Sequence, residues 1–240
     1  MATTAVNRSN GLVRPWEDGR SFVLDTRAPS PPLERLIDRH WMVRWDLRGK
    51  PGFRQETLPH PSLNLVIEPD GARVWGVPTQ RDVRTLEGRG WAAGIKLRPG
   101  AFTAISGIAA AGVTDGSVPI PECLGGAVGP ALIEAVDRDG LDASVAALEE
   151  RLAPYADLQD PALDLVAAVV EGMRELPPDT KVEAIARANH LAPRTLQRLF
   201  HRYVGVGPKW VLARYRMHDA VSALDGGWTG SLTDLAHAHG

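Results

Sequence analysis

The chain has 240 residues, of which 44% are hydrophobic and 23% are charged, and its formal net charge is −2. This length and composition are typical of a globular protein with one or two domains, and no apolar run reaches the roughly 18 residues of a membrane span. The single cysteine, Cys123, excludes an internal disulfide and the polar N-terminus lacks the apolar core of a signal peptide, so we expect a cytoplasmic protein without a membrane partner.

The N-terminal segment is rich in polar residues and ends in a proline-rich run at residues 28–32. Such a composition does not favour regular structure, so we predict a flexible lead-in over residues 1–32. A short helical pattern follows at residues 33–37 and begins the first structured part.

Short apolar and aromatic runs, separated by glycine and proline turns, dominate residues 33–125. The predicted strands lie at residues 40–47, 63–67, 73–77 and 91–97. Strands this short and closely spaced leave no room for crossover helices, so they favour a β-rich barrel or sandwich. Four tryptophans are candidates for lining an effector pocket, with core packing as the alternative that the sequence leaves open: Trp41, Trp45, Trp75 and Trp91.

The apolar period changes to that of helices in residues 126–178, which we interpret as a helical connector. Helices are predicted at residues 131–136, 143–152 and 160–176. The last of them would begin with Asp160 as its N-cap and Pro161 in its first turn. The pair Pro177-Pro178 ends it, so we place a domain boundary there.

The C-terminal segment is assigned to residues 179–240, and from Lys181 to Gly240 it carries eight basic residues against four acidic ones, whereas residues 1–180 are acidic. Helices are predicted at residues 181–189, 193–203, 208–224 and from residue 231 onward. Thr180 and Glu183 have the spacing of a capping box at the start of the first helix. The second helix has apolar residues at positions 196, 199, 200 and 203, which form one face. A basic end on an acidic body indicates that this end meets a polyanion.

Several short motifs in this segment follow one another in a fixed order. They are Ile185-Ala186, Leu196-Gln197-Arg198-Leu199-Phe200, Gly205-Val206-Gly207-Pro208, Arg216 with Ala220, and Leu235-Ala236 before Gly240. In order and spacing, residues 181–240 resemble the C-terminal DNA-binding region of AraC/XylS-type transcription regulators. The upstream part more loosely resembles the β-rich sensor domains that precede this region.

Two departures from the family pattern stand out. Ala192 occupies the position where a serine or asparagine usually caps the recognition helix, and the second recognition helix of the family is absent. We therefore expect either a fragment or a truncated DNA-binding region, cut after the first helix of its second helix-turn-helix motif.

The resemblance implies double-stranded DNA as the partner and the helix that begins at Pro193 as the recognition helix. The candidates for base contacts are Arg194, Gln197 and Arg198, because arginine pairs with guanine and glutamine with adenine in the major groove. The candidates for phosphate contacts are Thr195, His201, Arg202, Lys209 and Arg214. An ion pair with Glu183 is the alternative for Arg198, and a solvated surface position is the alternative for the phosphate candidates.

No metal, cofactor or catalytic site is predicted. His237 and His239 are two residues apart and would point to different sides of a helix. His40 and His60 lie in the β-rich part, but the closely spaced histidines and the glutamate of a cupin-like metal site are missing. Cys123 is interpreted as a buried apolar residue rather than a nucleophile.

The predicted fold class is α+β, with a β-rich sensor domain, a helical connector and an all-α helix-turn-helix domain. The leading hypothesis is a sequence-specific transcription regulator that responds to a small-molecule effector. The alternative is a small-molecule-binding or enzymatic β-domain with a DNA-binding region that no longer functions. A third hypothesis is a module that forms homodimers.

Overall fold

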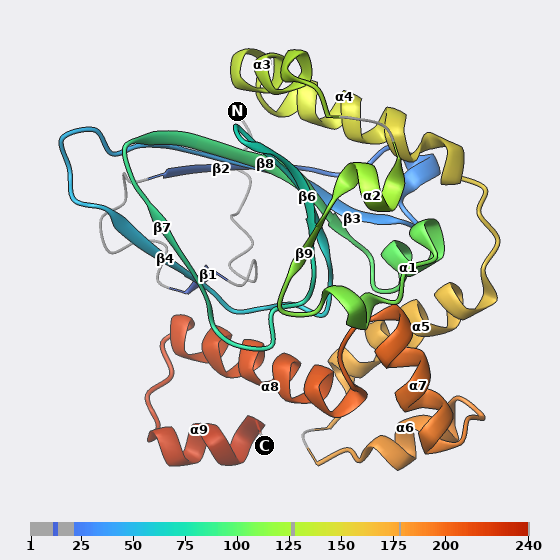
Figure 1. Cartoon of the computed structure of the whole chain (residues 1–240). Coiled ribbons are helices and arrows are strands. Elements are labelled where there is room, and N and C mark those ends of the chain that lie inside the picture. The colour runs from blue at the N-terminus through green and yellow to red at the C-terminus, as the bar shows by residue number, and fades with distance from the viewer. Residues whose placement is uncertain (1–11, 14–21, 126–127, 178, 240) are drawn as a thin grey trace.

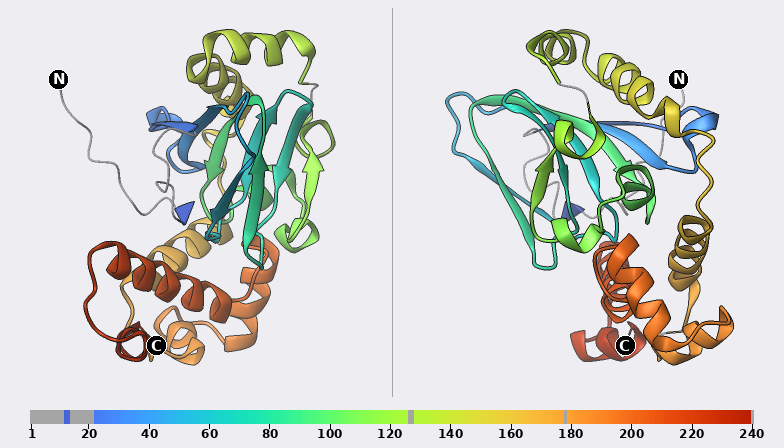
Figure 2. Two further views of the ribbon diagram at one scale, coloured as in Figure 1. Left: turned by 90° about the vertical axis from the view of Figure 1, so that its left-hand side faces the viewer. Right: turned by 45° about the vertical axis from the view of Figure 1, so that its right-hand side comes forward.

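The computed structural model describes residues 12–13, 22–125, 128–177 and 179–239. Two antiparallel β-sheets form most of the N-terminal part and a helical region follows, so the predicted α+β fold class is confirmed (Figure 1). The two sheets face each other as in a sandwich and, over the described residues, do not close into a barrel. One group of helices covers the larger sheet and another lies beyond the end of both sheets (Figure 2).

The larger sheet has strand order β2-β3-β8-β5-β6-β9, and every neighbouring pair is antiparallel. Its strands are β2 (Phe22–Arg27), β3 (Ile37–Asp46), β8 (Arg89–Leu97), β5 (Asn64–Glu68), β6 (Gly71–Trp75) and β9 (Ser117–Pro119). Side chains alternate between the faces of each strand. On β8, Ala93, Ile95 and Leu97 are buried in the main core. Ala92 and Lys96 lie on the opposite face, toward the smaller sheet.

The smaller sheet has strand order β1-β4-β7. Its strands are β1 (Leu12–Val13), β4 (Phe53–Thr57) and β7 (Asp82–Leu86). The sequence did not predict β4 or β7, because Phe-Arg-Gln-Glu-Thr and Asp-Val-Arg-Thr-Leu contain no apolar run. These strands are stabilised by pairing with each other, and the inner face of β4 contains the buried Gln55.

Two helices cover the outer face of the larger sheet: α3 (Pro130–Asp139) and α4 (Leu141–Leu152). Helix α4 lies against β3 and β8 and buries Leu148 and Leu152 there. The fully buried His40 of β3 points the same way, and its Nε2 lies 3.0 Å from Glu149 Oε1 of α4. This histidine therefore joins the sheet to a helix.

The remaining helices before the C-terminal region are short. They are α1 (Ala101–Ser106), α2 (Ile120–Leu124) and the 3₁₀ helices η1 (Pro31–Leu33), η2 (Ala110–Val113), η3 (Ala153–Tyr155) and η4 (Met173–Glu175). Cys123 is buried at the end of α2, which agrees with its interpretation as a buried apolar residue.

Helix α5 (Pro161–Gly172) belongs to the predicted connector and packs against the C-terminal helices. Asp160 is its N-cap as predicted, since its carboxylate accepts hydrogen bonds from the backbone N–H groups of Ala162 and Leu163. The same carboxylate accepts a hydrogen bond from the Tyr203 hydroxyl at 3.0 Å. Asp160 thus caps α5 and also joins it by a hydrogen bond to residues 193–203, the helix that the sequence predicts to bind DNA.

The C-terminal helices are α6 (Val182–Ala188), α7 (Pro193–Tyr203), α8 (Pro208–Asp225) and α9 (Leu232–His239). Helices α6 and α7 form a helix-turn-helix pair, and α8 closes its core from the other side. Ile185, Leu196, Phe200, Val211 and Tyr215 are buried in this core. The spacing of the apolar residues therefore predicted these helices to within a few residues.

The C-terminal helices rest directly on the β-rich part. The Thr103 hydroxyl of α1 donates a hydrogen bond to the backbone carbonyl of Arg202 at 2.8 Å, and the Thr114 hydroxyl donates one to the carbonyl of Gly205 at 2.9 Å. Gly205 has φ +91°, and a Cβ there would lie 2.7 Å from the Thr114 hydroxyl. Only glycine suits this turn between α7 and α8.

Three local predictions were wrong. The lead-in predicted over residues 1–32 contains strand β2, which is stabilised by pairing with β3 rather than by its own composition; residues 1–11 and 14–21 lie outside the described part. The helix predicted at residues 33–37 is replaced by η1 and the start of β3, because Pro31 favours a 3₁₀ turn and Ile37 pairs with Leu97.

The third concerns the predicted capping box. Lys181 is the N-cap of α6, and no side chain caps that helix, so Thr180 does not have the predicted role. A capping box of this kind is formed instead at the start of α9. The hydroxyl of Ser231 accepts a hydrogen bond from the Asp234 N–H at 3.1 Å, and the Asp234 carboxylate accepts one from the Ser231 N–H at 3.1 Å.

Candidate functional site

Helix α7 has two opposite faces of different chemistry. Leu196, Phe200 and Tyr203 are buried against neighbouring helices. The residues at positions 194, 197, 198 and 201 have the i, i+3, i+4, i+7 spacing of a single helix face, and all four are exposed. They are Arg194, Gln197, Arg198 and His201, and we name this set the α7 stripe.

The α7 stripe has no partner within the described part of the chain. None of its four side chains forms a hydrogen bond or an ion pair with a described residue, and the ion pair considered between Arg198 and Glu183 is not formed there. A row of unpaired donors on an exposed helix face is available for a partner outside the chain.

The five residues predicted to contact phosphates do not lie together. His201, Arg202 and Lys209 are exposed, and Thr195 is half-buried at the start of α7. Arg214 on α8 is turned toward the β-rich part, because its guanidinium stacks 4.6 Å from the Trp210 ring centroid and donates a hydrogen bond to the Thr79 carbonyl at 3.4 Å. The structure thus gives Arg214 a packing contact that the sequence did not predict.

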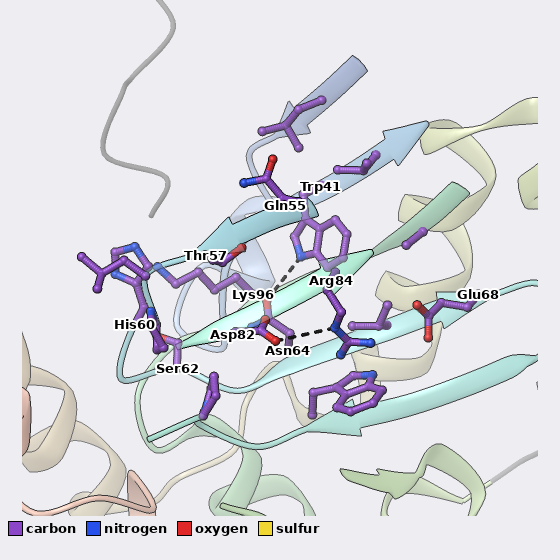
Figure 3. A pocket seen from close by; sticks show the side chains of 18 of the residues that line it. Trp41, Gln55, Thr57, His60, Ser62, Asn64, Glu68, Asp82, Arg84 and Lys96 are labelled. Carbon is purple, nitrogen blue, oxygen red and sulfur yellow. Dashed lines mark hydrogen bonds and ion pairs between the residues drawn. The ribbon is translucent and has the colours of Figure 1, made fainter. Parts of the chain in front are cut away.

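A second candidate site is a cavity of about 650 Å³ between the two sheets (Figure 3). Its floor is the inner face of the larger sheet, and β4 and β7 form the opposite wall. The guanidinium of Arg84 on β7 lies 4.3 Å from the Trp75 ring centroid, and the rings of Phe22 and Phe53 lie 6.0 Å apart. These two contacts bridge the sheets on either side of the cavity.

The strand register divides the floor into a polar end and an apolar end. Arg39, Lys96 and Asn64 are register partners across β3, β8 and β5, and they form the polar end. Six residues further along β3, Trp45 is paired with Phe22 of β2 and forms the apolar end. At about 3.3 Å per residue, these two ends lie about 20 Å apart.

The opposite wall has the same gradient. Along β4 and β7, the register pairs are Phe53 with Leu86, Gln55 with Arg84, and Thr57 with Asp82. The apolar pair is on the side of Phe22, whose ring contacts Phe53. Both walls are therefore polar at the Lys96 end, and the Phe22 end is more apolar, although Glu68 and Thr85 also line the cavity away from Lys96.

Three of the four tryptophans predicted for an effector pocket line this cavity: Trp41, Trp45 and Trp75. Trp91 does not, because it lies on the other face of β8, is only 6% exposed and belongs to the core. A Cβ at Gly90 would lie 2.4 Å from the Trp45 ring, so this glycine makes room for the indole on the floor.

Lys96 is the most buried cation of the polar end, with an exposed fraction of 8%. Burial lowers the pKa of its ammonium to about 8, and the nearby Asp38 carboxylate partly offsets that effect. The Lys96 Nζ lies 3.4 Å from Asp38 Oδ2. The same carboxylate lies 3.2 Å from the Arg39 Nε. Lys96 is thus charged at neutral pH, although it is held inside the protein.

His60 lies beside Lys96 at the polar end (Figure 3). Both of its ring nitrogens are shut off from solvent and have no hydrogen-bond partner among the described residues. Burial, reinforced by the positive charge of Lys96, lowers the pKa of His60 to about 2. The ring is therefore neutral, with one unused donor and one unused acceptor.

The His60 ring also joins the cavity to the C-terminal helices. It stacks on the ring of His218 of α8, with centroids 4.1 Å apart and planes 21° from parallel. The Nε2 of His218 donates a hydrogen bond to the carbonyl of Pro59 at 3.1 Å. Burial lowers the pKa of His218 to about 4, so both stacked rings are neutral at pH 7. We name this contact the His60–His218 stack.

Sequence reasoning did not find Lys96, Gln55 or His218 as site residues. Gln55 is 8% exposed, and its Oε1 has no partner in the described structure. The signal that could have found Lys96 is a lysine in an otherwise apolar strand, Trp-Ala-Ala-Gly-Ile-Lys-Leu. His60 was considered only as a metal ligand, and among the described residues no group of three or more histidine, cysteine or acidic side chains could hold a metal.

Comparison with known proteins gives one match. Residues 25–119 match a family model described as a domain of unknown function (DUF6597), and this range runs from β2 to β9. Neither the curated proteins nor the solved structures contain a match. Within the described residues, no helix has the length and apolar character needed to cross a bilayer. The matched range contains the residues that line the cavity except Phe22 and Leu24, and it leaves the α7 stripe outside.

Proposed function

We propose that the chain is a sequence-specific DNA-binding regulator, with α7 as its recognition helix and the cavity between the sheets as its effector site. The α7 stripe carries the proposal, because four polar side chains on one exposed helix face have no partner in the described structure. In support, domains of the matched family are often found in AraC-type regulators.

The dimensions of α7 suit a major groove. A helix fits into this groove, whose width is about 12 Å. From Arg194 to His201 the helix rises about 10 Å, at 1.5 Å per residue, which spans about three base-pair steps of 3.4 Å. Arg194 and Arg198 are suited to the paired acceptors of guanine, and Gln197 is suited to adenine. The opposite face of α7 is locked by Leu196 and Phe200, so the stripe is presented by a rigid element.

The test begins with selection of preferred sites from random double-stranded DNA, followed by gel-shift titrations on the selected site and on a scrambled one. Arg198→Ala is expected to weaken binding to the selected site by about 1–3 kcal/mol and to change the scrambled site much less. Arg54→Ala is the matched control, because it removes an exposed arginine of the β-rich part, remote from α7 in the fold.

Equal losses on both sites for Arg198→Ala would contradict base recognition by this residue. Failure to enrich any sequence would overturn the proposed function itself.

The second candidate is a ligand-binding β-domain with helices that no longer bind DNA, and the cavity between the sheets is the observation that favours it. A salt series separates the two functions. A DNA-binding regulator loses affinity steeply as the salt concentration rises, with a slope set by the number of phosphates contacted. A ligand-binding domain alone shows neither that slope nor a preferred site.

A further inference from the structure

The polar end of the cavity has unused hydrogen-bonding capacity in a place that water does not reach freely. An ammonium has three donors, and among the described residues Asp38 is the partner of Lys96, at 3.4 Å. His60 adds a neutral ring with two buried nitrogens that have no partner. Buried polar groups are normally paired, so unpaired ones that face a cavity indicate a missing ligand group.

The charge of this end selects the missing group. Lys96 is positively charged and lies on the cavity floor, and Arg39 lies in the same register row. Lys96 and Arg39 share the single Asp38 carboxylate. The Asp82 carboxylate of the opposite wall is paired with Arg84 at 3.7 Å, so this end keeps a net positive charge. A cation would be repelled there, and a neutral hydroxyl would leave that net charge uncompensated. A carboxylate can accept from the Lys96 ammonium and from the His60 ring N–H together, and such charge-assisted hydrogen bonds are the stronger kind.

The other end of the cavity selects the rest of the ligand. Phe22, Val43, Trp45 and Leu86 line this end with hydrocarbon and ring faces, and Phe53 packs on Phe22. The polar groups on this side are the side chains of Thr85 and Glu68 and the indole N–H of Trp45. That N–H is already used, because it donates to the Glu87 carbonyl at 3.0 Å. A sugar or a nucleotide would find few hydrogen-bond partners for its many hydroxyl groups there, whereas an apolar chain or ring needs none.

We propose that the cavity binds an amphipathic carboxylate, whose head lies between the Lys96 ammonium and the His60 ring and whose apolar body lies along Trp41 and Trp45. This deepens the proposed function, because it names the chemical class of the effector. The head would also touch the ring that stacks on α8, so binding acts on the contact between the cavity and the DNA-binding helices.

The test uses three probes that share a chain and differ in the head: octanoate, octanol and octylamine. Calorimetric titration of the whole chain at pH 7 is expected to give octanoate about tenfold or greater preference over octanol, with octylamine weakest. Lys96→Met keeps a long apolar side chain and is expected to reduce octanoate affinity to that of octanol. Its affinity for octanol should stay unchanged, which shows that the cavity is still folded.

Two further variants make the test specific. His60→Phe keeps an aromatic ring against His218 but removes both nitrogens, so it is expected to lower octanoate affinity several-fold. It replaces Lys96→Met in the test if that variant does not fold. Arg54→Met removes an exposed cation from the outer face of β4 and should change nothing. Equal affinity for octanoate and octanol, preference for octylamine, or no binding of any probe would overturn the proposal.

Gel shifts on the same samples distinguish this failure from failure of the proposed function. If the wild-type protein prefers its selected DNA site but does not prefer octanoate, only the ligand class is wrong. If it prefers octanoate but shows no preference for any DNA site, only the proposed DNA-binding function is wrong.

Discussion

The His60–His218 stack predicts a pH-dependent weakness at the junction of the two parts of the fold. The folded state holds both imidazoles neutral, with the pKa of His60 lowered to about 2 and that of His218 to about 4, chiefly by burial. The unfolded chain has ordinary histidines, which bind protons as the pH falls below about 6.5. Acid therefore favours the unfolded state in the range between pH 6.5 and the lowered pKa values, and the free energy of unfolding falls there.

The magnitude follows from proton counting. Each histidine that binds a proton only when unfolded changes the free energy of unfolding by about 1.4 kcal/mol per pH unit. From pH 6.5 to pH 5 this is about 2 kcal/mol for His60. For His218, which is partly exposed, we halve the value to allow for solvent screening, which gives about 3 kcal/mol for the pair. The charged groups around the stack all oppose its protonation: Arg39, Lys96, Arg174 and Arg214.

The assay is urea unfolding at several pH values between 5 and 7 for the wild type and for the double variant His60→Phe, His218→Phe. Phenylalanine keeps two stacked rings but cannot bind a proton. The wild type is expected to lose about 3 kcal/mol more than the variant between pH 6.5 and pH 5. His40 also has a pKa lowered by burial, but it is present in both proteins and cancels. Identical pH slopes for the two proteins would refute the reasoning.

Two other predictions follow from the core and from the cavity. Phe200→Ala removes a fully buried ring from the helix-turn-helix core, so we expect a loss of about 3–5 kcal/mol in the stability of the C-terminal helices, measured by thermal and urea unfolding. That variant should lose DNA binding and keep octanoate binding, and loss of both would show that the two parts unfold together. Octanoate affinity is expected to fall as the pH rises through about 8, because Lys96 loses its charge there; a flat calorimetric profile from pH 7 to pH 9 would count against Lys96 as the anion-binding group.

The C-terminal helices were predictable because their signals are local. The apolar positions 196, 200 and 203 repeat with the helical period, and Pro193 marks the first turn of α7. Residues a few positions apart define such a helix without reference to the rest of the chain. The same sequence also indicated which side of α7 would be exposed, because an apolar face implies a polar face opposite to it.

The polar end of the cavity was not predictable in this way. Lys96, His60 and His218 are separated by tens of residues, and the register of β3, β5 and β8 together with the docking of α8 brings them together. Period-two alternation predicts that Trp41 and Trp45 share a face, but not whether that face meets helices or the cavity. Trp91 is an example, because the alternation of side chains along β8 places it on the face that meets the core and not on the face that lines the cavity.

Two hydrogen bonds described above have a consequence for engineering. Thr103 donates one to the end of α7, and Thr114 donates the other to the turn that follows. They satisfy carbonyl groups that a free helix end would leave to water. A chimera that joins α6–α9 to an unrelated ligand-binding domain would lose the hydroxyl donors of Thr103 and Thr114. It would also lose the close packing of Gly205 against Thr114. A transplant would therefore have to carry α1 and η2 along with the C-terminal helices, since these two segments supply the hydrogen-bond donors that those helices contact.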